Sequence, residues 1–142
     1  MKPIRELLRG KSGGLCTIDP NAPVFEALKL MAEKNIGALL VVEQGTLVGI
    51  VSERDYARKV ILHGKSSHDT PVKEIMTERP ICVQPSSTVE ECMALMTDKR
   101  VRHLPVMENG NLLGVLSIGD LVKETISEQQ QMIKQLESYI HS

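Results

Sequence analysis

The chain has 142 residues, a net charge of −1, 42% hydrophobic residues and only 2% aromatic residues, with no tryptophan. A charge this close to zero gives no reason to expect general attraction to nucleic acid or to an anionic membrane. Proteins that bind single-stranded nucleic acid stack its bases on aromatic side chains, and such side chains are almost absent here. We therefore expect an aliphatic core and neither a nucleic-acid nor a membrane partner.

The chain begins without the apolar stretch of a signal peptide, and no apolar run approaches the ~18 residues of a membrane span. Three cysteines, Cys16, Cys82 and Cys92, are scattered along the sequence. None forms a C-x-x-C spacing with another, so neither a zinc site nor a disulfide framework is indicated. These features predict a cytoplasmic protein whose cysteines are packing residues.

The sequence repeats itself at an offset of 65 residues without a gap. Such self-similarity indicates a duplicated structural unit. Identities at this offset include Pro20 with Pro85, Val24 with Val89, Met31 with Met96, Gly45 with Gly110, Gly49 with Gly114, Ser52 with Ser117 and Asp55 with Asp120. A helical segment precedes each copy, at 4–8 and at 72–76, with an offset of 68; the glycine-rich stretch 10–14 accounts for the three extra residues.

Each copy predicts the element order β-α-β-β-α. A short strand, Thr17–Ile18 or Cys82–Val83, is followed by a helix whose apolar residues recur at helical spacing. Two apolar runs then flank a turn containing Gly45 or Gly110, which is a hairpin signal. A second helix follows Ser52 or Ser117.

Helix boundaries are indicated by capping residues and by apolar spacing. Ser87 or Thr88 can cap the second copy's first helix. The last helix, after Asp120, is expected to run nearly to the end of the sequence. Its apolar stripe, interrupted at Gln129, is too short to predict a coiled coil on its own. The stripe consists of Ile126, Ile133, Leu136 and Ile140.

These repeats resemble CBS domains. The resemblance rests on the β-α-β-β-α unit, the run Leu104-Pro105-Val106, the hairpin glycines and the Ser-x-x-Asp at each hairpin exit. It covers residues 3 to about 125 and is similar to the tandem pair called the Bateman module, as found in stand-alone bacterial proteins. It implies an α/β (α+β) fold of two repeats related by a pseudo-two-fold axis, with flanking N- and C-terminal helices. The predicted divisions are 1–71, 72–125 and a helical tail, 126–142.

The resemblance also implies two clefts that bind adenine nucleotides. Each cleft takes residues from the early strands of one repeat and the Ser-x-x-Asp from the other. One would combine Thr17, Ala22, Ile36, Gly37 and Ala38 with Ser117 and Asp120. The other would combine Cys82, Ser87, Val101, Arg102 and His103 with Ser52, Arg54 and Asp55.

The residue types suit this chemistry. A carboxylate can accept hydrogen bonds from both hydroxyls of a ribose, and a serine at a helix N-terminus suits a phosphate. The alternative interpretation is that each Ser-x-x-Asp is a helix capping box with Asp in place of Glu. The copies differ in charge, because Arg102-His103 stands where the first copy has Gly37-Ala38. Cys82 likewise replaces Thr17, which removes a hydroxyl.

The sequence therefore predicts a non-catalytic nucleotide sensor that acts on a partner protein, without a catalytic cofactor. AMP is the expected ligand, with ADP, ATP or NAD as alternatives. No nucleophile–base pair, metal cluster or phosphate-binding glycine loop indicates an enzyme. A second hypothesis is a structural dimerisation module with degenerate clefts. Relatives of this kind associate through their helical faces, so we also expect a homodimer.

Overall fold

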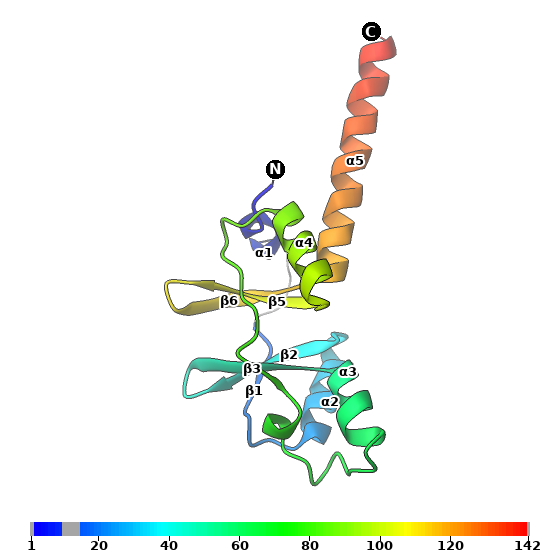
Figure 1. Ribbon diagram of the computed structural model, residues 1–142. Coiled ribbons are helices and arrows are strands. Elements are labelled where there is room, and N and C mark those ends of the chain that lie inside the picture. Colours follow the sequence, from blue (N-terminus) through cyan, green and yellow to red (C-terminus); the bar gives the residue numbers. More distant parts are fainter. Residues whose placement is uncertain (1, 10–14, 142) are drawn as a thin grey trace. The chain divides into compact units, whose positions relative to one another are not determined.

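The computed structural model describes residues 2–9 and 15–141, so the glycine-rich stretch 10–14 lies outside the described residues. Its helices and strands form two compact units (Figure 1). The first-repeat unit is Gly14–Ile81, and the second-repeat unit is Met1–Gly13 together with Cys82–Ser142. The segment before the first repeat thus belongs to the second-repeat unit, and residues 72–81 belong to the first-repeat unit. The divisions predicted from the sequence grouped each segment with the repeat that it precedes.

The first-repeat unit is built on a four-stranded sheet of order β1-β2-β3-β4. β1 pairs parallel with β2, and the other neighbours are antiparallel. Its elements are β1 (Thr17–Ile18), α2 (Val24–Lys34), β2 (Ala38–Glu43), β3 (Thr46–Ser52), α3 (Glu53–Tyr56), the π-helical turn η1 (Ala57–Ile61), the 3₁₀ turn η2 (Val72–Glu74) and β4 (Thr77–Glu78). The predicted elements are confirmed, and β4 is an addition.

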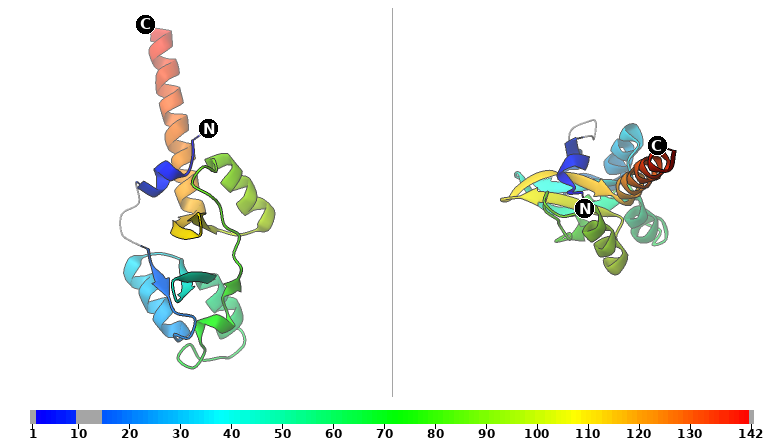
Figure 2. Two further views of the ribbon diagram at one scale, coloured as in Figure 1. Left: turned by 90° about the vertical axis from the view of Figure 1, so that its left-hand side faces the viewer. Right: turned by 90° about the horizontal axis from the view of Figure 1, so that it is seen from above.

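The second-repeat unit repeats this plan with a smaller sheet. Its elements are α1 (Arg5–Arg9), α4 (Val89–Lys99), β5 (His103–Glu108), β6 (Asn111–Ser117) and α5 (Ile118–His141). Thr88 caps α4 by accepting a hydrogen bond from the Glu91 N–H at 3.1 Å, as predicted. α5 continues past the hairpin and α4 of its unit, as Figure 1 and the left-hand view of Figure 2 show.

The predicted strand at Cys82–Val83 is wrong in extent, because only a single parallel bridge between Val83 and Val106 forms there. Val83 makes both ladder bonds itself: its N–H donates to the Pro105 carbonyl, and its carbonyl accepts from the Met107 N–H, each at 2.9 Å. One bridge thus stands where the first repeat has a two-residue strand. Pro20 and Pro85 stand at the same place in the two repeats, so proline does not account for this difference.

Both hairpins turn at a pair of residues with positive φ. The φ angles are 49° and 79° at Gln44 and Gly45, and 51° and 80° at Asn109 and Gly110. Two central residues with positive φ give the primed turn whose twist matches that of the flanking strands. Each hairpin also carries a register shift at the same place, between Val41 and Val42 and between Val106 and Met107. The duplication thus extends to backbone irregularities.

Each repeat buries its own aliphatic core, and the segment preceding the other repeat completes it. Val72 and Ile75 lie in the core of the first-repeat unit, whereas Ile4 lies in the core of the second. Backbone bonds fix both arrangements, since the Val72 N–H donates to the Ala22 carbonyl at 2.8 Å and the Ile4 N–H donates to the Ser87 carbonyl at 2.9 Å. No helix in residues 2–9 or 15–141 is long and apolar enough to cross a membrane.

Gly49 and Gly114 are the repeated hairpin glycines that these preceding segments approach. A Cβ at Gly49 would lie 2.6 Å from the Met76 sulfur and 2.9 Å from the Thr77 carbonyl oxygen. A Cβ at Gly114 would meet only the Leu8 Cδ2, at 3.0 Å. Backbone cannot yield as a leucine side chain can, so the two equivalent glycines are under different steric constraint.

We predict that Gly49→Ala lowers the free energy of unfolding by about 2 kcal/mol, while Gly114→Ala lowers it by less than about 1 kcal/mol. The two variants add the same methyl group at equivalent positions, so each is the other's control. Chemical denaturation of both variants measures the difference. Equal destabilisation would mean that the contact with Thr77 is not the constraint.

Candidate functional site

The exit from the first hairpin is closed by reciprocal hydrogen bonds between Ser52 and Asp55. The Ser52 hydroxyl accepts from the Asp55 N–H at 3.2 Å, and the Asp55 carboxylate accepts from the Ser52 N–H at 2.9 Å. The Ser52 hydroxyl also donates to the same carboxylate oxygen at 3.1 Å. This is a capping box, and it fixes the first turn of α3 directly at the end of β3.

The second hairpin ends in the same way. The Ser117 N–H donates to the Asp120 carboxylate at 2.8 Å, and the Asp120 N–H donates to the Ser117 hydroxyl at 3.1 Å. The capping interpretation of both Ser-x-x-Asp motifs is therefore confirmed. A carboxylate offers about four lone-pair sites on two oxygens, so a cap made by one oxygen is compatible with ribose binding.

Each repeat also brings its strand-entry segment, Ile36–Ala38 or Val101–His103, to its own capping box. In the antiparallel register, Ala38 pairs with Ser52 and His103 pairs with Ser117. The Glu53 N–H donates to the Gly37 carbonyl at 3.1 Å, and the Ile118 N–H donates to the Arg102 carbonyl at 2.9 Å.

The hairpin therefore places two predicted strand residues of each repeat beside the capping box of the same repeat. These neighbours belong to different predicted clefts. The combination of the strand residues of one repeat with the Ser-x-x-Asp of the other stays a prediction.

The remaining predicted residues lie nearer the start of each repeat. Thr17 is exposed on β1, opposite Leu40 of β2. The backbone of Ala22 is engaged by Asp19 and Val72. Cys82 is exposed and precedes the single bridge of its repeat.

Ser87 is half-buried, and its hydroxyl accepts from the Gln84 N–H at 3.3 Å. That bond belongs to the turn before α4, so the Ser87 hydroxyl already has a local structural role.

Lys59 lies beside the first capping box, although it is not among the predicted site residues. Its side chain is 46% exposed, yet the ammonium lies 3.5 Å from the Asp55 carboxylate and donates to the Ile75 carbonyl at 2.9 Å. The Asp–Lys spacing of four residues along a helix could have indicated this pair. Lys59 thus connects the capping carboxylate to the segment that completes the first core.

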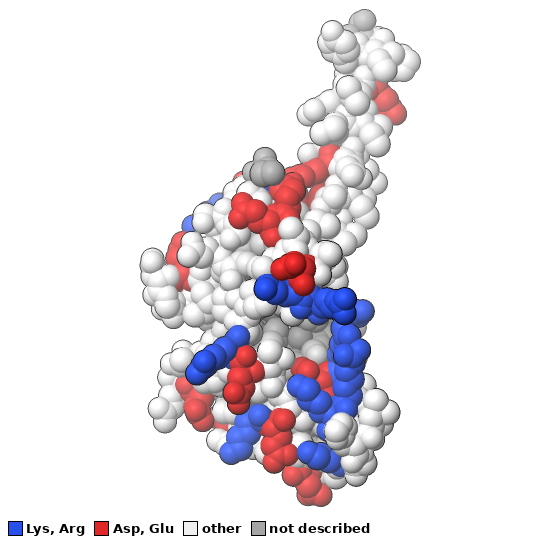
Figure 3. All heavy atoms as spheres, in the orientation of Figure 1, with Lys and Arg blue, Asp and Glu red and all other residues white. Residues whose placement is uncertain are grey.

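Lys59 belongs to a basic group on α3 and η1, together with Arg54 and Arg58, and all three are exposed. Figure 3 shows Lys and Arg side chains gathered on the side of the first-repeat unit that carries these two elements. Cations near a helix start raise the local positive potential that the helix dipole already creates. Glu53 and Asp55 lie in the same turn, so this end of the first-repeat unit carries both signs of charge, with cations in excess.

The second repeat keeps a cation at one of these three positions. Gly119, Lys123 and Glu124 stand at the equivalent positions, so an acid follows Asp120 where a lysine follows Asp55. Glu124 accepts a hydrogen bond from the Lys2 ammonium at 2.6 Å, and this bond raises the pKa of Lys2. The two capping carboxylates consequently lie in different electrostatic surroundings despite identical caps.

The buried cysteine offers no reactive thiol, and the described residues offer no cluster for a metal ion. Cys92 is fully buried, and desolvation, helped by the neighbouring Glu91 carboxylate, raises the pKa of its thiol to about 11. A thiol with such a pKa is protonated at neutral pH and unreactive. Within residues 2–9 and 15–141, no group of three or more His, Cys, Asp and Glu side chains is placed to hold a metal ion.

The caps predict a difference between two substitutions of Asp120. Asp120→Ala removes the acceptor of the Ser117 N–H and should lower the free energy of unfolding by about 1 kcal/mol. Asp120→Asn keeps an acceptor oxygen and loses only the charge at the helix start, so it should cost about half as much. Urea denaturation measures both. An equal loss in the two variants would show that the charge, not the hydrogen bond, holds the cap.

Two comparisons of sequence identify the repeats. The chain matches the CBS domain over residues 13–62 and 72–127. It is 45% identical over 130 residues to the CBS domain-containing protein CBSX3, mitochondrial, of Arabidopsis thaliana. That match covers 88% of this chain but 62% of the Arabidopsis protein, which is less than two thirds of its length.

Solved structures share the fold. A protein with CBS domains from Burkholderia ambifaria superimposes with a TM-score of 0.85 and 50% identity, covering 90% of this chain and 96% of its own. The CBS domain protein PAE2072 of Pyrobaculum aerophilum, solved in complex with AMP, has a TM-score of 0.74 at 27% identity, covering 84% and 89% of the two chains. With both repeats matched in sequence and in structure, the chain belongs to the CBS-domain family and carries two such domains in tandem.

Proposed function

We propose that this protein binds adenine nucleotides at its two Ser-x-x-Asp motifs and relays nucleotide levels to a partner protein. The observation that carries the proposal is the repeated capping box, which holds the Asp55 and Asp120 carboxylates in a fixed orientation at a helix start. The AMP complex of the Pyrobaculum relative supports a nucleotide as the ligand. Cytoplasmic location is part of the same proposal.

The chemistry of the motif fits a ribose. The two hydroxyls of a ribose are vicinal donors, and a carboxylate can accept from both through charge-assisted bonds. The cap holds the carboxylate in one orientation, so little side-chain entropy remains to be lost on binding. As the family resemblance implies, we propose that each ligand is shared between the Ser-x-x-Asp of one repeat and the strand residues of the other, with Thr17, Ile36, Val101 and Arg102 among them.

We further propose that the two sites differ in the ligand they prefer. Arg54 and Arg102 both belong to the site of Asp55, and the equivalent residues of the other site are Gly119 and Gly37. Both arginines are exposed. An arginine presents a planar set of donors that matches phosphate oxygens and stays charged at physiological pH. The Asp55 site should therefore favour ATP, whereas the Asp120 site suits AMP or a larger dinucleotide such as NAD.

A structural dimerisation module is the competing function, and the capping boxes alone would serve it equally well. The two functions differ in what the carboxylate charge does. A cap needs an acceptor oxygen, whereas tight binding of a ribose diol also uses the negative charge. We propose binding rather than catalysis in either case, and a homodimer as the assembled form.

The first prediction concerns the carboxylates. Asp55→Asn and Asp120→Asn should each weaken binding at one of two nucleotide sites about ten- to a hundred-fold, because charge-assisted hydrogen bonds contribute about 1.5–3 kcal/mol. Calorimetric titration with AMP measures affinity and stoichiometry. Asp98→Asn, at an exposed aspartate near the end of α4, controls for the loss of one charge. Wild-type affinity in both variants would refute ribose binding and leave the dimerisation module.

The second prediction concerns phosphate preference. Arg102→Ala should weaken the binding of ATP about ten-fold more than the binding of AMP. The reason is that only ATP has β- and γ-phosphates for the guanidinium to reach. Separate titrations of the two nucleotides test this, with Lys99→Ala, at an exposed lysine three residues earlier, as control. If ATP and AMP weaken by the same factor, or neither weakens, the two sites are not distinguished by Arg102.

A further inference from the structure

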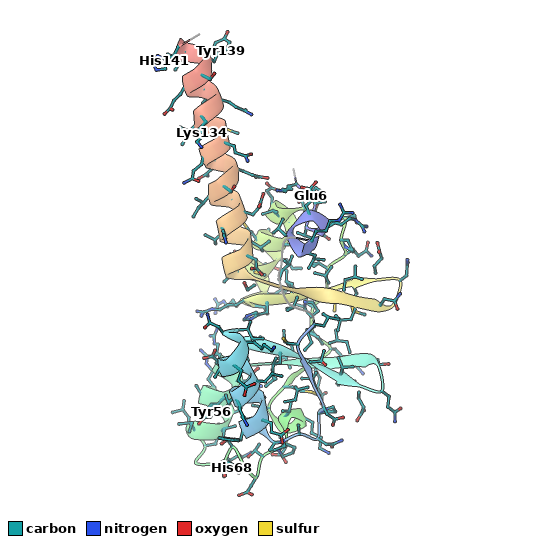
Figure 4. The ribbon with its side chains drawn as sticks, turned by 180° about the vertical axis from the view of Figure 1, so that it is seen from behind. Glu6, Tyr56, His68, Lys134, Tyr139 and His141 are labelled. Carbon is teal, nitrogen blue, oxygen red and sulfur yellow. The ribbon has the colours of Figure 1, made fainter. Side chains whose placement is uncertain are left out.

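α5 extends well beyond the core of the second-repeat unit in Figure 1 and in the left-hand view of Figure 2. It has 24 residues, and Leu121 is its buried residue. Thr125 donates to the Met93 sulfur at 3.4 Å, which ties the second turn to α4. Figure 4 shows Lys134, Tyr139 and His141 on the part that lies past the hairpin. Packing within the unit therefore accounts for the first two turns only.

The exposed part of α5 carries an apolar seam with heptad spacing. Its positions alternate four and three residues apart, which keeps them on one face of a coiled-coil helix. Five of the six are aliphatic and exposed, and the sixth is Gln129. They are Val122 (41% exposed), Ile126 (50%), Gln129, Ile133 (54%), Leu136 (57%) and Ile140 (74%). Exposed aliphatic residues in such a row mark an interaction surface.

The charges of α5 favour a protein over a membrane surface as the occupant. The helix contains two lysines, Lys123 and Lys134, and four acidic residues. Membrane-surface helices instead have a lysine- and arginine-rich polar face. The part of α5 seen in Figure 3 is mostly uncharged. A second helix with the same apolar seam would cover the exposed seam of α5. A second copy of the chain supplies such a helix.

We propose that α5 pairs antiparallel with α5 of a second copy. In the register that uses the whole seam, Val122 lies against the partner's Ile140 and Ile126 against the partner's Leu136. Lys123 then flanks the seam opposite the partner's Glu137, and two-fold symmetry makes this ion pair twice. A parallel pair has no such complement, because Lys123 and Glu137 would face Ile118 and Met132 of the other helix. Charge complementarity thus selects the antiparallel orientation.

Gln129 is the one polar residue in the seam. A polar side chain among apolar layers weakens association while limiting the registers that a coiled coil can adopt. Replacing it by an aliphatic residue should therefore strengthen the pair. The interface can therefore be tested by a variant that strengthens association as well as by variants that weaken it.

Light scattering and sedimentation of the full chain at tens of micromolar test the surface. Ile133→Lys should halve the mass of the wild-type assembly, and Gln129→Leu should tighten association at least about five-fold. Gln131→Lys, which places the same charge on the opposite side of α5, is the matched control and should keep the wild-type mass. All three variants should retain AMP binding, because the substituted residues lie outside both Ser-x-x-Asp motifs and both strand-entry segments. The proposed pairing of α5 does not depend on the proposed nucleotide binding.

Two outcomes would overturn the interface. One is an unchanged mass for Ile133→Lys, which would place any dimer on other helical faces. The other is a monomeric wild-type chain, which would leave the seam to a different protein.

Charge reversal tests the orientation. Lys123→Glu and Glu137→Lys should each weaken association about ten-fold, because each creates two like-charge contacts. The double variant should restore association to within about three-fold of wild type. A double variant weaker than either single variant would contradict the antiparallel pair.

Discussion

The reciprocal hydrogen bonds between Ser and Asp at each hairpin exit determine where a strand becomes a helix in this protein. Without an acceptor for the first amides of α3 and α5, those donors would be satisfied only by water. The cap lets a seven-residue strand pass into a helix with no intervening loop. It also holds a carboxylate beside the backbone of the neighbouring strand entry. The same pair of bonds thus sets the fold locally and presents the group that we propose binds ribose.

The two repeats share this capping box, but the charged residues around it differ. Core positions, turn residues with positive φ and register shifts recur 65 residues apart, whereas Lys59 becomes Glu124 and Arg102 stands in place of Gly37. A duplicated fold tolerates charge differences at its surface because surface charges contribute little to stability. Equivalent motifs thus lie among different charges, and we propose that they differ in ligand preference.

Much of the fold could be predicted because duplication tests each prediction twice. A glycine or a capping serine at one position is weak evidence, but its recurrence at the same offset is strong. The single bridge at Val83 could not be predicted, because Thr17-Ile18 and Cys82-Val83 have similar strand propensity and the difference lies in tertiary pairing. β4 was missed because Thr77–Glu78 is polar and short, and only its pairing with β3 makes it a strand. Helical spacing could predict that Lys59 lies near Asp55. It could not predict the hydrogen bond from Lys59 to the Ile75 carbonyl, because Ile75 is distant in sequence.

The proposed ribose contact, a carboxylate that accepts from both hydroxyls, can be tested with the ligand itself. Calorimetric titration of the wild-type chain with AMP and with 2′-deoxy-AMP compares a vicinal diol with a single hydroxyl. Loss of one charge-assisted hydrogen bond should weaken 2′-deoxy-AMP about ten-fold or more relative to AMP. Equal affinity for the two nucleotides, or no binding of AMP at millimolar concentration, would contradict the account.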